Sequence, residues 1–239
     1  MSTTPVQAGS RAPHLELIPL SALERHGFEP LVEGLLFRDS RAAVYGSAGT
    51  GKGILALDLA MCVATGRPWH GCGVSRGKVL YIDGSAGGSL ADRVKAWELA
   101  NHRGSDEISF LLPPNAIAAE QVDELVDLAT ELSPSLIVLN VTLRTVPGAD
   151  ENAALTISRR LRDATRACVL LVWHATLAEH WESSHVLAAV DTTIEVERQG
   201  PAVTVSNRKQ RNAREHTDIV LRLADYGDSV ALLGGASGT

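Results

Sequence analysis

The chain is poor in several residue types, and each shortage excludes a class of protein. Only 4% of its 239 residues are aromatic, and its three cysteines (Cys62, Cys72 and Cys168) have the spacing of neither a zinc site nor a disulfide framework. We therefore expect a reducing compartment. No apolar run reaches the roughly 18 residues that a membrane-spanning helix needs, and the opening MSTTPVQAGSRAPH lacks the apolar core of a secretory signal. These absences predict a cytoplasmic protein that does not enter a membrane.

An excess of positive charge is also missing. The chain carries 22 basic and 28 acidic side chains, a formal net charge of −6, which gives no support to an extended nucleic-acid surface. Its length suits one sizeable domain, and neither an internal repeat nor a linker divides it. We expect residues 1–14, which are rich in Pro, Ser, Thr and Gly, to be disordered and residues 15–239 to form a single domain.

What the chain does contain is a regular alternation of short apolar runs and helical patterns. The apolar runs predict strands at 42–46, 78–83, 108–113, 135–141 and 168–173. Helices are predicted between them at 52–65, 120–132 and about 152–166, with one more that carries Leu90, Val94, Trp97 and Leu99. The helix at 120–132 has an apolar face of Val122, Leu125, Leu128 and Leu132. Strands that alternate with helices predict an α/β fold, a mostly parallel twisted sheet with helices on both faces.

The last third of the chain has a different pattern. The runs TTIEVER, AVTVSNRK, DIVLRLAD and DSVALLG are separated by turn signals such as Gln199-Gly200-Pro201 and Tyr226-Gly227-Asp228. We interpret them as antiparallel strands that extend the sheet.

The stretch GSAGTGKG, residues 46–53, nearly matches the phosphate-loop pattern G-x-x-x-x-G-K-[ST]. Gly46, Gly51 and Lys52 fall in place, but the final hydroxyl residue is replaced by Gly53. Backbone N–H groups and the following helix dipole bind phosphate in such loops, and the lysine reaches the β- and γ-phosphates. The predicted contacts to a nucleotide are made by Gly46, Ser47, Ala48, Gly49, Thr50, Gly51, Lys52, Gly53 and Ile54. The alternative is a glycine-rich turn between a strand and a helix.

Several stretches together resemble a known family. In order, they are YGSAGTGKGILALDLAMCVATGRPWHG, GKVLYIDG, GGSLADRVKAW, LIVLN, VPGADEN, LLVWH, AAVDTTIEVER and KQRNA. They resemble the RecA-like ATPases related to the plasmid replicative helicase RepA, a group labelled AAA_25 domains, over roughly residues 30 to 225. The resemblance implies a RecA-like P-loop NTPase fold and ATP or ADP as the ligand. It also implies a ring of identical subunits, typically a hexamer, that moves along DNA.

The chain departs from this family at the positions that serve magnesium and catalysis. Gly53 stands where the resemblance implies a magnesium-binding Ser or Thr, and Asn140 where it implies an aspartate that orients the metal. Ser85 stands at the position of the catalytic glutamate. Asp83, two residues earlier, shares a strand face with that position and is a weak substitute for it. Because the glycines and the lysine are retained, we expect phosphate binding to persist, magnesium binding to be uncertain and ATP hydrolysis to be weak or lost.

Other family positions are mixed. His174 matches a histidine that senses the γ-phosphate, although an ordinary strand-end histidine fits equally well. Lys209 and Arg211 match basic residues that reach a neighbouring subunit's nucleotide, and the alternative is a solvated hairpin turn. The loop at 175–184 has two acids and no Lys or Arg, so DNA binding through it is doubtful. His180 and Trp181 in that loop could stack on a base or form a surface patch.

Three functions follow from these observations. The first is a nucleotide-binding, ring-forming protein with weak or absent hydrolysis that acts as a regulator or assembly component. The second is an active ATP-driven helicase or replication ATPase that tolerates the substitutions. The third is a scaffold that no longer binds nucleotide, against which the retained Gly46, Gly51 and Lys52 argue. A protein partner remains open in each case.

Overall fold

The structure is a computed structural model, and it describes residues 17, 19–20, 27–84, 89–113, 117, 119–140, 151–173 and 185–234. Some of the predictions concern residues outside these ranges. They are the disordered segment 1–14, Ser85, His174, and the loop at 175–184 with His180 and Trp181.

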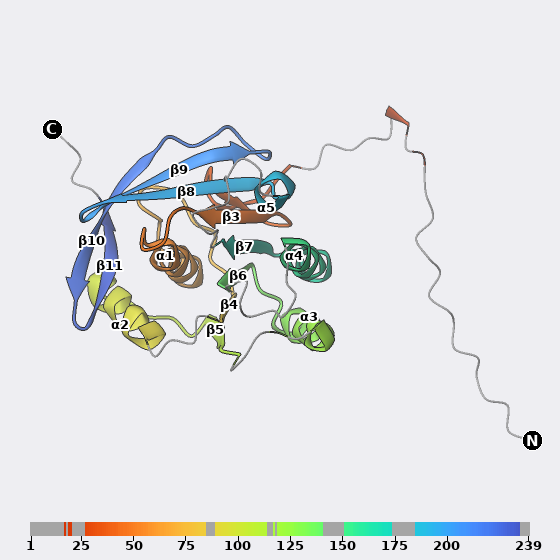
Figure 1. The fold of residues 1–239 in the computed structure, drawn as a ribbon. Helices are drawn as coiled ribbons and strands as arrows, with labels where there is room; N and C mark the ends of the chain where they lie inside the picture. The colour runs from red at the N-terminus through yellow and green to blue at the C-terminus, as the bar shows by residue number, and fades with distance from the viewer. Residues whose placement is uncertain are drawn as a thin grey trace, which may run out of the picture.

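Nine strands in the described part of the chain form one sheet, in the spatial order β11-β10-β9-β8-β3-β7-β6-β4-β5 (Figure 1). Neighbouring strands are parallel from β5 to β8 and antiparallel from β8 to β11. The strands are β3 (Arg41–Tyr45), β4 (Val79–Asp83), β5 (Ile108–Leu111), β6 (Leu136–Asn140), β7 (Cys168–Val172), β8 (Thr192–Gln199), β9 (Ala202–Gln210), β10 (Ile219–Tyr226) and β11 (Ser229–Gly234). A separate hairpin pairs β1 (Pro30–Val32) with β2 (Leu36–Phe37).

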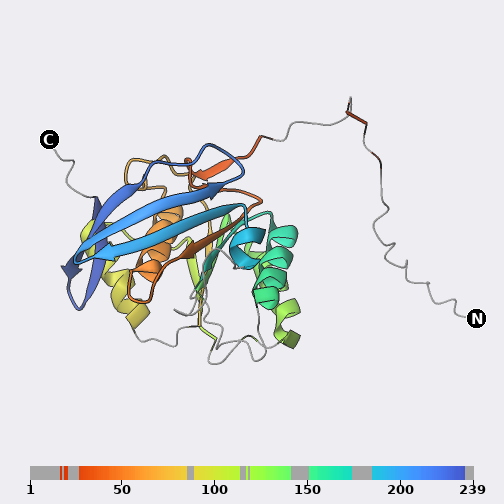
Figure 2. The ribbon, with the colours of Figure 1, turned by 45° about the horizontal axis from the view of Figure 1, so that its top comes forward.

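Helices cover both faces of the sheet (Figures 1 and 2). On one face lie α1 (Lys52–Thr65) and α2 (Ser89–Asn101), and the antiparallel strands curve over so that β11 contacts both helices. On the other face lie α3 (Val122–Leu132), which follows the short 3-10 helix η2 (Ala119–Gln121), then α4 (Glu151–Thr165) and α5 (His185–Ala189). None of the helices in the described residues combines the length and apolar composition that crossing a membrane requires.

The central strands are apolar without interruption because each of their two faces packs on helices. In β4, Val79 and Tyr81 enter one core cluster, while Leu80 and Ile82 enter the other. Residues of β3, β6 and β7 alternate between the two clusters in the same way, because successive side chains of a strand point to opposite faces. Parallel sheets are buried on both faces, so a continuous apolar run is the expected sequence pattern.

Helix α1 is apolar on all sides and is buried along almost its whole length. Helices of this kind lie inside a protein rather than on its surface, and each fully buried Leu or Met side chain contributes about 1.5–3 kcal/mol. The helix ends where Gly66 adopts a left-handed φ of 70° and its N–H bonds the carbonyl of Cys62. The start of α1, at Lys52, is therefore held firmly against the sheet.

The predicted fold class is confirmed, and the bounds of α1 match the prediction. Three details differ. Strand β8 was expected to be antiparallel to its neighbours, but it is parallel to β3 and antiparallel only to β9. Leu128, assigned to the apolar face of the helix at 120–132, is 49% exposed because α3 covers the end of the sheet and packs mainly through Val122 and Leu125. The β1–β2 hairpin was not predicted.

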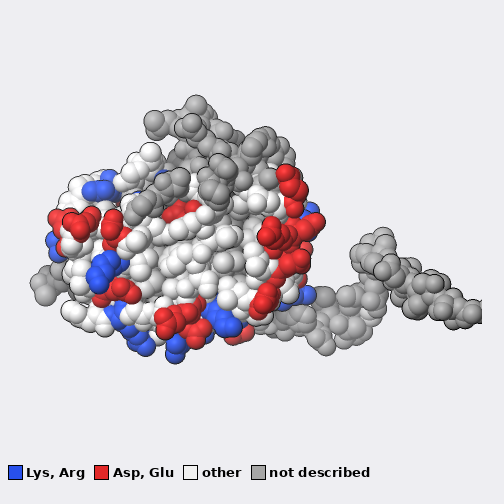
Figure 3. Space-filling model, turned by 90° about the horizontal axis from the view of Figure 1, so that it is seen from below, with Lys and Arg blue, Asp and Glu red and all other residues white. Residues whose placement is uncertain are grey.

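Acidic side chains gather on the outer surface of α3. Figure 3 views the molecule from below and shows acidic groups along the side where α3 lies in Figure 1. The exposed acids of α3 and η2 are Glu120, Asp123, Glu124, Asp127 and Glu131. This surface repels a polyanion such as DNA at short range.

Candidate functional site

The phosphate loop, Asp83 and Asn140, all predicted to belong to the site, lie at one edge of the sheet. Strands β3, β4 and β6 run parallel, so their carboxyl ends lie at the same edge. The loop at 46–51 follows β3, while Asp83 and Asn140 end β4 and β6 and are paired in register. Ligands of open α/β sheets bind in the crevice beyond the carboxyl ends of the strands. The sequence and the topology therefore indicate the same region.

Glycine is required at two positions of the loop. Gly46 has a φ of 146°, and a Cβ there would lie 2.2 Å from the backbone oxygen of Val196 in β8. Gly51 has a φ of 98° and caps the N-terminus of α1 without a side chain. Any other residue would be strained at both places, since a Cβ disfavours positive φ. These glycines let the backbone turn sharply from β3 into α1, so the first N–H groups of the helix point out of its end.

Lys52 is buried inside the loop. The residue is 4% exposed, and its Nζ donates hydrogen bonds to the carbonyls of Gly46, at 2.8 Å, and Ser47, at 2.7 Å. Burial lowers the pKa of Lys52 below its ordinary value. An ammonium group has three donors, of which these two carbonyls take two. The loop thus holds a cation at its centre, which suits a bound anion.

Two nitrogen donors lie nearest to the place where Gly53 lacks a side chain. A Cβ built on Gly53 would lie 3.5 Å from Nη1 of Arg93 in α2 and 3.8 Å from Nδ2 of Asn140. The same Nδ2 donates a hydrogen bond to Oδ1 of Asp83 at 3.2 Å, and both side chains are almost fully buried. The Tyr81 hydroxyl donates a long hydrogen bond, 3.5 Å, to the Gly53 carbonyl, and burial raises the pKa of Tyr81.

These residues do not fit the magnesium ion that the family implies. Mg²⁺ takes oxygen ligands in octahedral geometry. Gly53 has no side-chain oxygen, Asn140 directs its amide nitrogen toward Gly53, and the Arg93 guanidinium brings a positive charge to the same place. Asp83 is the carboxylate that the structure places in this group, and it accepts the Asn140 hydrogen bond.

Sequence reasoning overlooked Arg93 and Tyr81. Arg93 stands in GGSLADRVKAW, a stretch used only for its helical pattern, and Tyr81 stands in a strand used only for its apolar character. A signal for Arg93 was available, because it is three residues after Leu90 and four before Trp97, both buried. Residues at these spacings share one face of a helix, so the sequence predicts that Arg93 faces the interior of the protein.

Lys209 and Arg211 do not lie at the phosphate loop. Lys209 lies near the end of β9 and pairs in register with Thr193, and Arg211 directly follows the strand, toward the amino edge of the parallel strands. Lys209 Nζ donates to the carbonyls of Leu187, at 3.0 Å, and Ala188, at 2.8 Å, and Arg211 Nη2 donates to Ala188 at 3.3 Å. Both cations thus satisfy carbonyls at the end of α5. Both cations therefore have partners within the chain, and their role at a neighbouring subunit's nucleotide stays a prediction.

Comparisons with known proteins identify the family and the fold. The family model AAA_25, described as an AAA domain, matches residues 11–180. The crystal structure of the RadB recombinase superposes with a TM-score of 0.56 at 15% sequence identity, over 79% of this chain and 89% of that chain. At this identity the likeness establishes the fold alone. No curated protein gave a significant match. The fold of the chain is that of the RecA-like P-loop ATPases, and by the extent of the family match the chain belongs to the AAA_25 family of AAA domains.

Proposed function

We propose that the chain binds ATP or ADP through the loop at 46–53, hydrolyses it weakly or not at all, and acts as a regulator or as a component of a larger assembly. One observation carries this proposal. The loop keeps a buried, charged Lys52 at its centre, while the neighbouring Gly53 offers no oxygen to a metal.

Phosphate binding needs only groups that the described residues supply. The sharp turn at Gly46 and Gly51 leaves the first N–H groups of α1 available, and the helix dipole favours an anion there. Lys52 adds a full charge. Hydrogen bonds between charged groups are about twice as strong as neutral ones, so Lys52 is expected to dominate the affinity.

Hydrolysis needs more than phosphate binding. A positioned general base is worth about 10²–10⁴-fold in rate, and phosphoryl transfer relies further on a metal to neutralise developing charge. Gly53 and Asn140 supply no charge to such an ion. Ser85, at the position of the family's glutamate, remains a predicted loss. Asp83 is the residue that could act as a base, but its Oδ1 accepts a hydrogen bond from Asn140.

We also propose that the chain forms a homo-oligomeric ring, for which a hexamer is the first expectation. The support is the family resemblance together with the place of Lys209 and Arg211, which is remote from the chain's own loop. Arg211 is 54% exposed, so it is accessible to a neighbouring subunit even while it contacts α5.

The test combines nucleotide titration with sedimentation. The wild-type chain should bind ATP, Lys52→Ala should not, and Lys95→Ala, which removes an exposed lysine on α2, should bind as wild type does. Sedimentation at micromolar concentration should give a mass above that of a monomer. Equal ATP binding by wild type and Lys52→Ala would contradict the nucleotide proposal, and a monomer with and without ATP would contradict the ring.

The second candidate function is an active helicase or replication ATPase. Asp83 favours it, because a buried carboxylate at the carboxyl end of β4 is a usable base if Asn140 releases it. Under this alternative the chain would hydrolyse ATP at a rate on the order of 1 s⁻¹ or faster. It would also bind single-stranded DNA tightly at physiological salt, and changes in the loop at 175–184 would abolish that binding.

A further inference from the structure

We propose that Arg93 is a phosphate ligand of this site and takes the charge-neutralising place beside Gly53 that a hydroxyl-bound magnesium ion holds in a complete phosphate loop. The proposal rests on the proposed nucleotide binding and adds a residue and a metal-free mode of binding to it. The ligand class is a nucleoside di- or triphosphate held entirely by donors of the protein.

The guanidinium of Arg93 lies beside Gly53. In the complete motif the Ser or Thr at this place extends its hydroxyl from Cβ to the metal. A Cβ at Gly53 would already be in van der Waals contact with Arg93 Nη1, at 3.5 Å. The guanidinium therefore lies next to the place where that hydroxyl and its ion would be.

The two side-chain atoms closest to the missing Cβ of Gly53 are suited to an anion. Arg93 Nη1 and Asn140 Nδ2 both face the missing Cβ, and both are hydrogen-bond donors. The hydrogen bond to Asp83 fixes the Asn140 amide in this orientation. Donors suit a phosphate oxygen, and a permanent positive charge at this distance repels a divalent cation.

Helix α2, which carries Arg93, is anchored in the core. Leu90 and Trp97 lie on the same face of α2 as Arg93 and are buried in the core. Trp97 Nε1 donates a 2.7 Å hydrogen bond to Oδ1 of Asp58, a buried residue of α1, so the two helices are fastened together. Arg93 is thus held toward the helix that begins at Lys52.

An intramolecular carboxylate would compete with a phosphate for the Arg93 guanidinium. Within the described part of the chain, no carboxylate forms a salt bridge with its guanidinium, unlike those of Arg38, Arg166 and Arg208. The side chain is half-buried, so its charge is less screened than that of a surface arginine. A phosphate oxygen accepting from Arg93 would satisfy it.

The experiment titrates a fluorescent ATP analogue into the full chain, in EDTA and in Mg²⁺. Wild type should bind in EDTA with an affinity within about threefold of that in Mg²⁺. Arg93→Gln should bind about tenfold more weakly in EDTA, the loss expected for a charged hydrogen bond. Lys95→Gln removes the same charge from an exposed position of α2 and should change the affinity less than twofold. Arg93→Lys keeps the charge without the two-armed donor geometry and should lie between wild type and Arg93→Gln.

Thermal unfolding of each variant, without nucleotide, controls for folding. If Arg93→Gln unfolds early, Arg93→Lys decides the question instead. Wild-type binding that needs Mg²⁺, or equal affinities of Arg93→Gln and Lys95→Gln in EDTA, would overturn the role of Arg93 and leave the nucleotide proposal intact. If wild type binds in neither buffer, both the role of Arg93 and the nucleotide proposal are overturned. Lys52→Ala, measured alongside, gives the signal expected when no nucleotide binds.

Discussion

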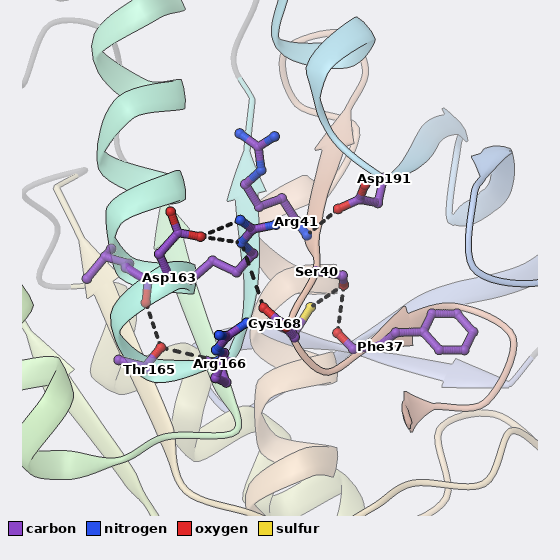
Figure 4. Close-up of polar contacts among 12 residues, drawn as sticks. Phe37, Ser40, Arg41, Asp163, Thr165, Arg166, Cys168 and Asp191 are labelled. Atoms are coloured by element: carbon purple, nitrogen blue, oxygen red, sulfur yellow. Dashed lines mark hydrogen bonds and ion pairs between the residues drawn. The ribbon is translucent and has the colours of Figure 1, made fainter. Parts of the chain in front are cut away.

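The two edges of the parallel sheet use the same kinds of polar residue in opposite ways. At the amino edge, charged groups find fixed partners within the chain (Figure 4). Asp191 Oδ2 accepts the backbone N–H of Arg41 at 3.0 Å, and Arg166 donates to Asp39 at 2.8 Å. At the carboxyl edge, Lys52 Nζ lies inside the phosphate loop, and the donors Arg93 Nη1 and Asn140 Nδ2 lie beside Gly53. The former set holds the fold together, and we propose that the latter set binds an anion.

Cys168 is a further structural group at the amino edge. Cys168, at the start of β7, is fully buried beside Ser40, and burial raises the pKa of its thiol to about 12 (Figure 4). A thiol with so high a pKa is protonated and unreactive near neutral pH. The Cys168 side chain is therefore a part of the packing.

The largest expected effect is that of Lys52→Ala at the carboxyl edge. Nucleotide affinity should fall about 100-fold or more, since the ammonium makes charge-assisted hydrogen bonds to phosphate. The free energy of unfolding in the absence of nucleotide should change much less. Isothermal titration and thermal unfolding measure the two quantities, and a large loss of stability with unchanged affinity would reverse the assignment of this edge.

Restoring the family residues should raise turnover by about 10- to 100-fold. The variant combines Gly53→Ser, Asn140→Asp and Ser85→Glu with Arg93→Gln, because the guanidinium lies where the ion would bind. A Cβ at residue 53 meets its neighbours only at ordinary contact distance, so the serine fits. The gain is set below the full effect of a general base because these groups act together and are not additive. Phosphate release in steady state measures it, and turnover as high with Arg93 retained would contradict the competition between Arg93 and magnesium.

Asp191→Ala should lower the free energy of unfolding by about 1–3 kcal/mol while leaving nucleotide affinity unchanged. The carboxylate accepts the Arg41 N–H and lies 3.6 Å from Arg211 Nη1, and its loss leaves the backbone donor without this partner. Urea unfolding gives the stability, and titration of the folded variant gives the affinity. Weaker nucleotide binding by the folded variant would contradict the claim that the amino edge serves stability and only the carboxyl edge serves nucleotide binding.

Alkaline pH should weaken nucleotide binding earlier than an ordinary lysine would allow. Burial lowers the pKa of Lys52, so the ammonium loses its proton at a lower pH than the usual 10.5. The charge on Lys52 is present below that lowered pKa and disappears as the pH rises through it, and affinity falls with it. Lys52→Arg, which stays charged, should bind without this decline. Titrations between pH 7 and pH 10 give the comparison, and identical pH profiles would contradict it.

The smallest effect is expected from Lys209→Met. Its ammonium caps carbonyls at the end of α5, a contact worth about 1 kcal/mol. We expect a small loss of stability and no change in the affinity of the chain's own loop. Sedimentation of the same variant sharpens the comparison, since dissociation without any loss of stability would assign Lys209 to a neighbouring subunit instead.

Most of the fold could be predicted from the sequence because its signals are local. The unbroken apolar runs in β4, β6 and β7, and the alternation of strands with helices, require a parallel sheet covered on both faces. The bounds of α1 follow from Gly51 and Gly66 on either side of an apolar segment. The phosphate loop was equally readable, since Gly46, Gly51 and Lys52 satisfy a fixed spacing.

Only the tertiary structure decided which groups of distant segments meet. Arg93 is 40 positions after Gly53, and its approach depends on how α2 crosses back over the sheet and packs on Asp58 through Trp97. The hydrogen bond between Asn140 and Asp83 depends on the register of β6 against β4. Spacing along the chain determines local backbone geometry, whereas the partner of a charged side chain is set by packing between elements. For this reason the sequence by itself determined the phosphate-loop motif and its sharp turn, and the packed structure determined that Arg93 lies beside it.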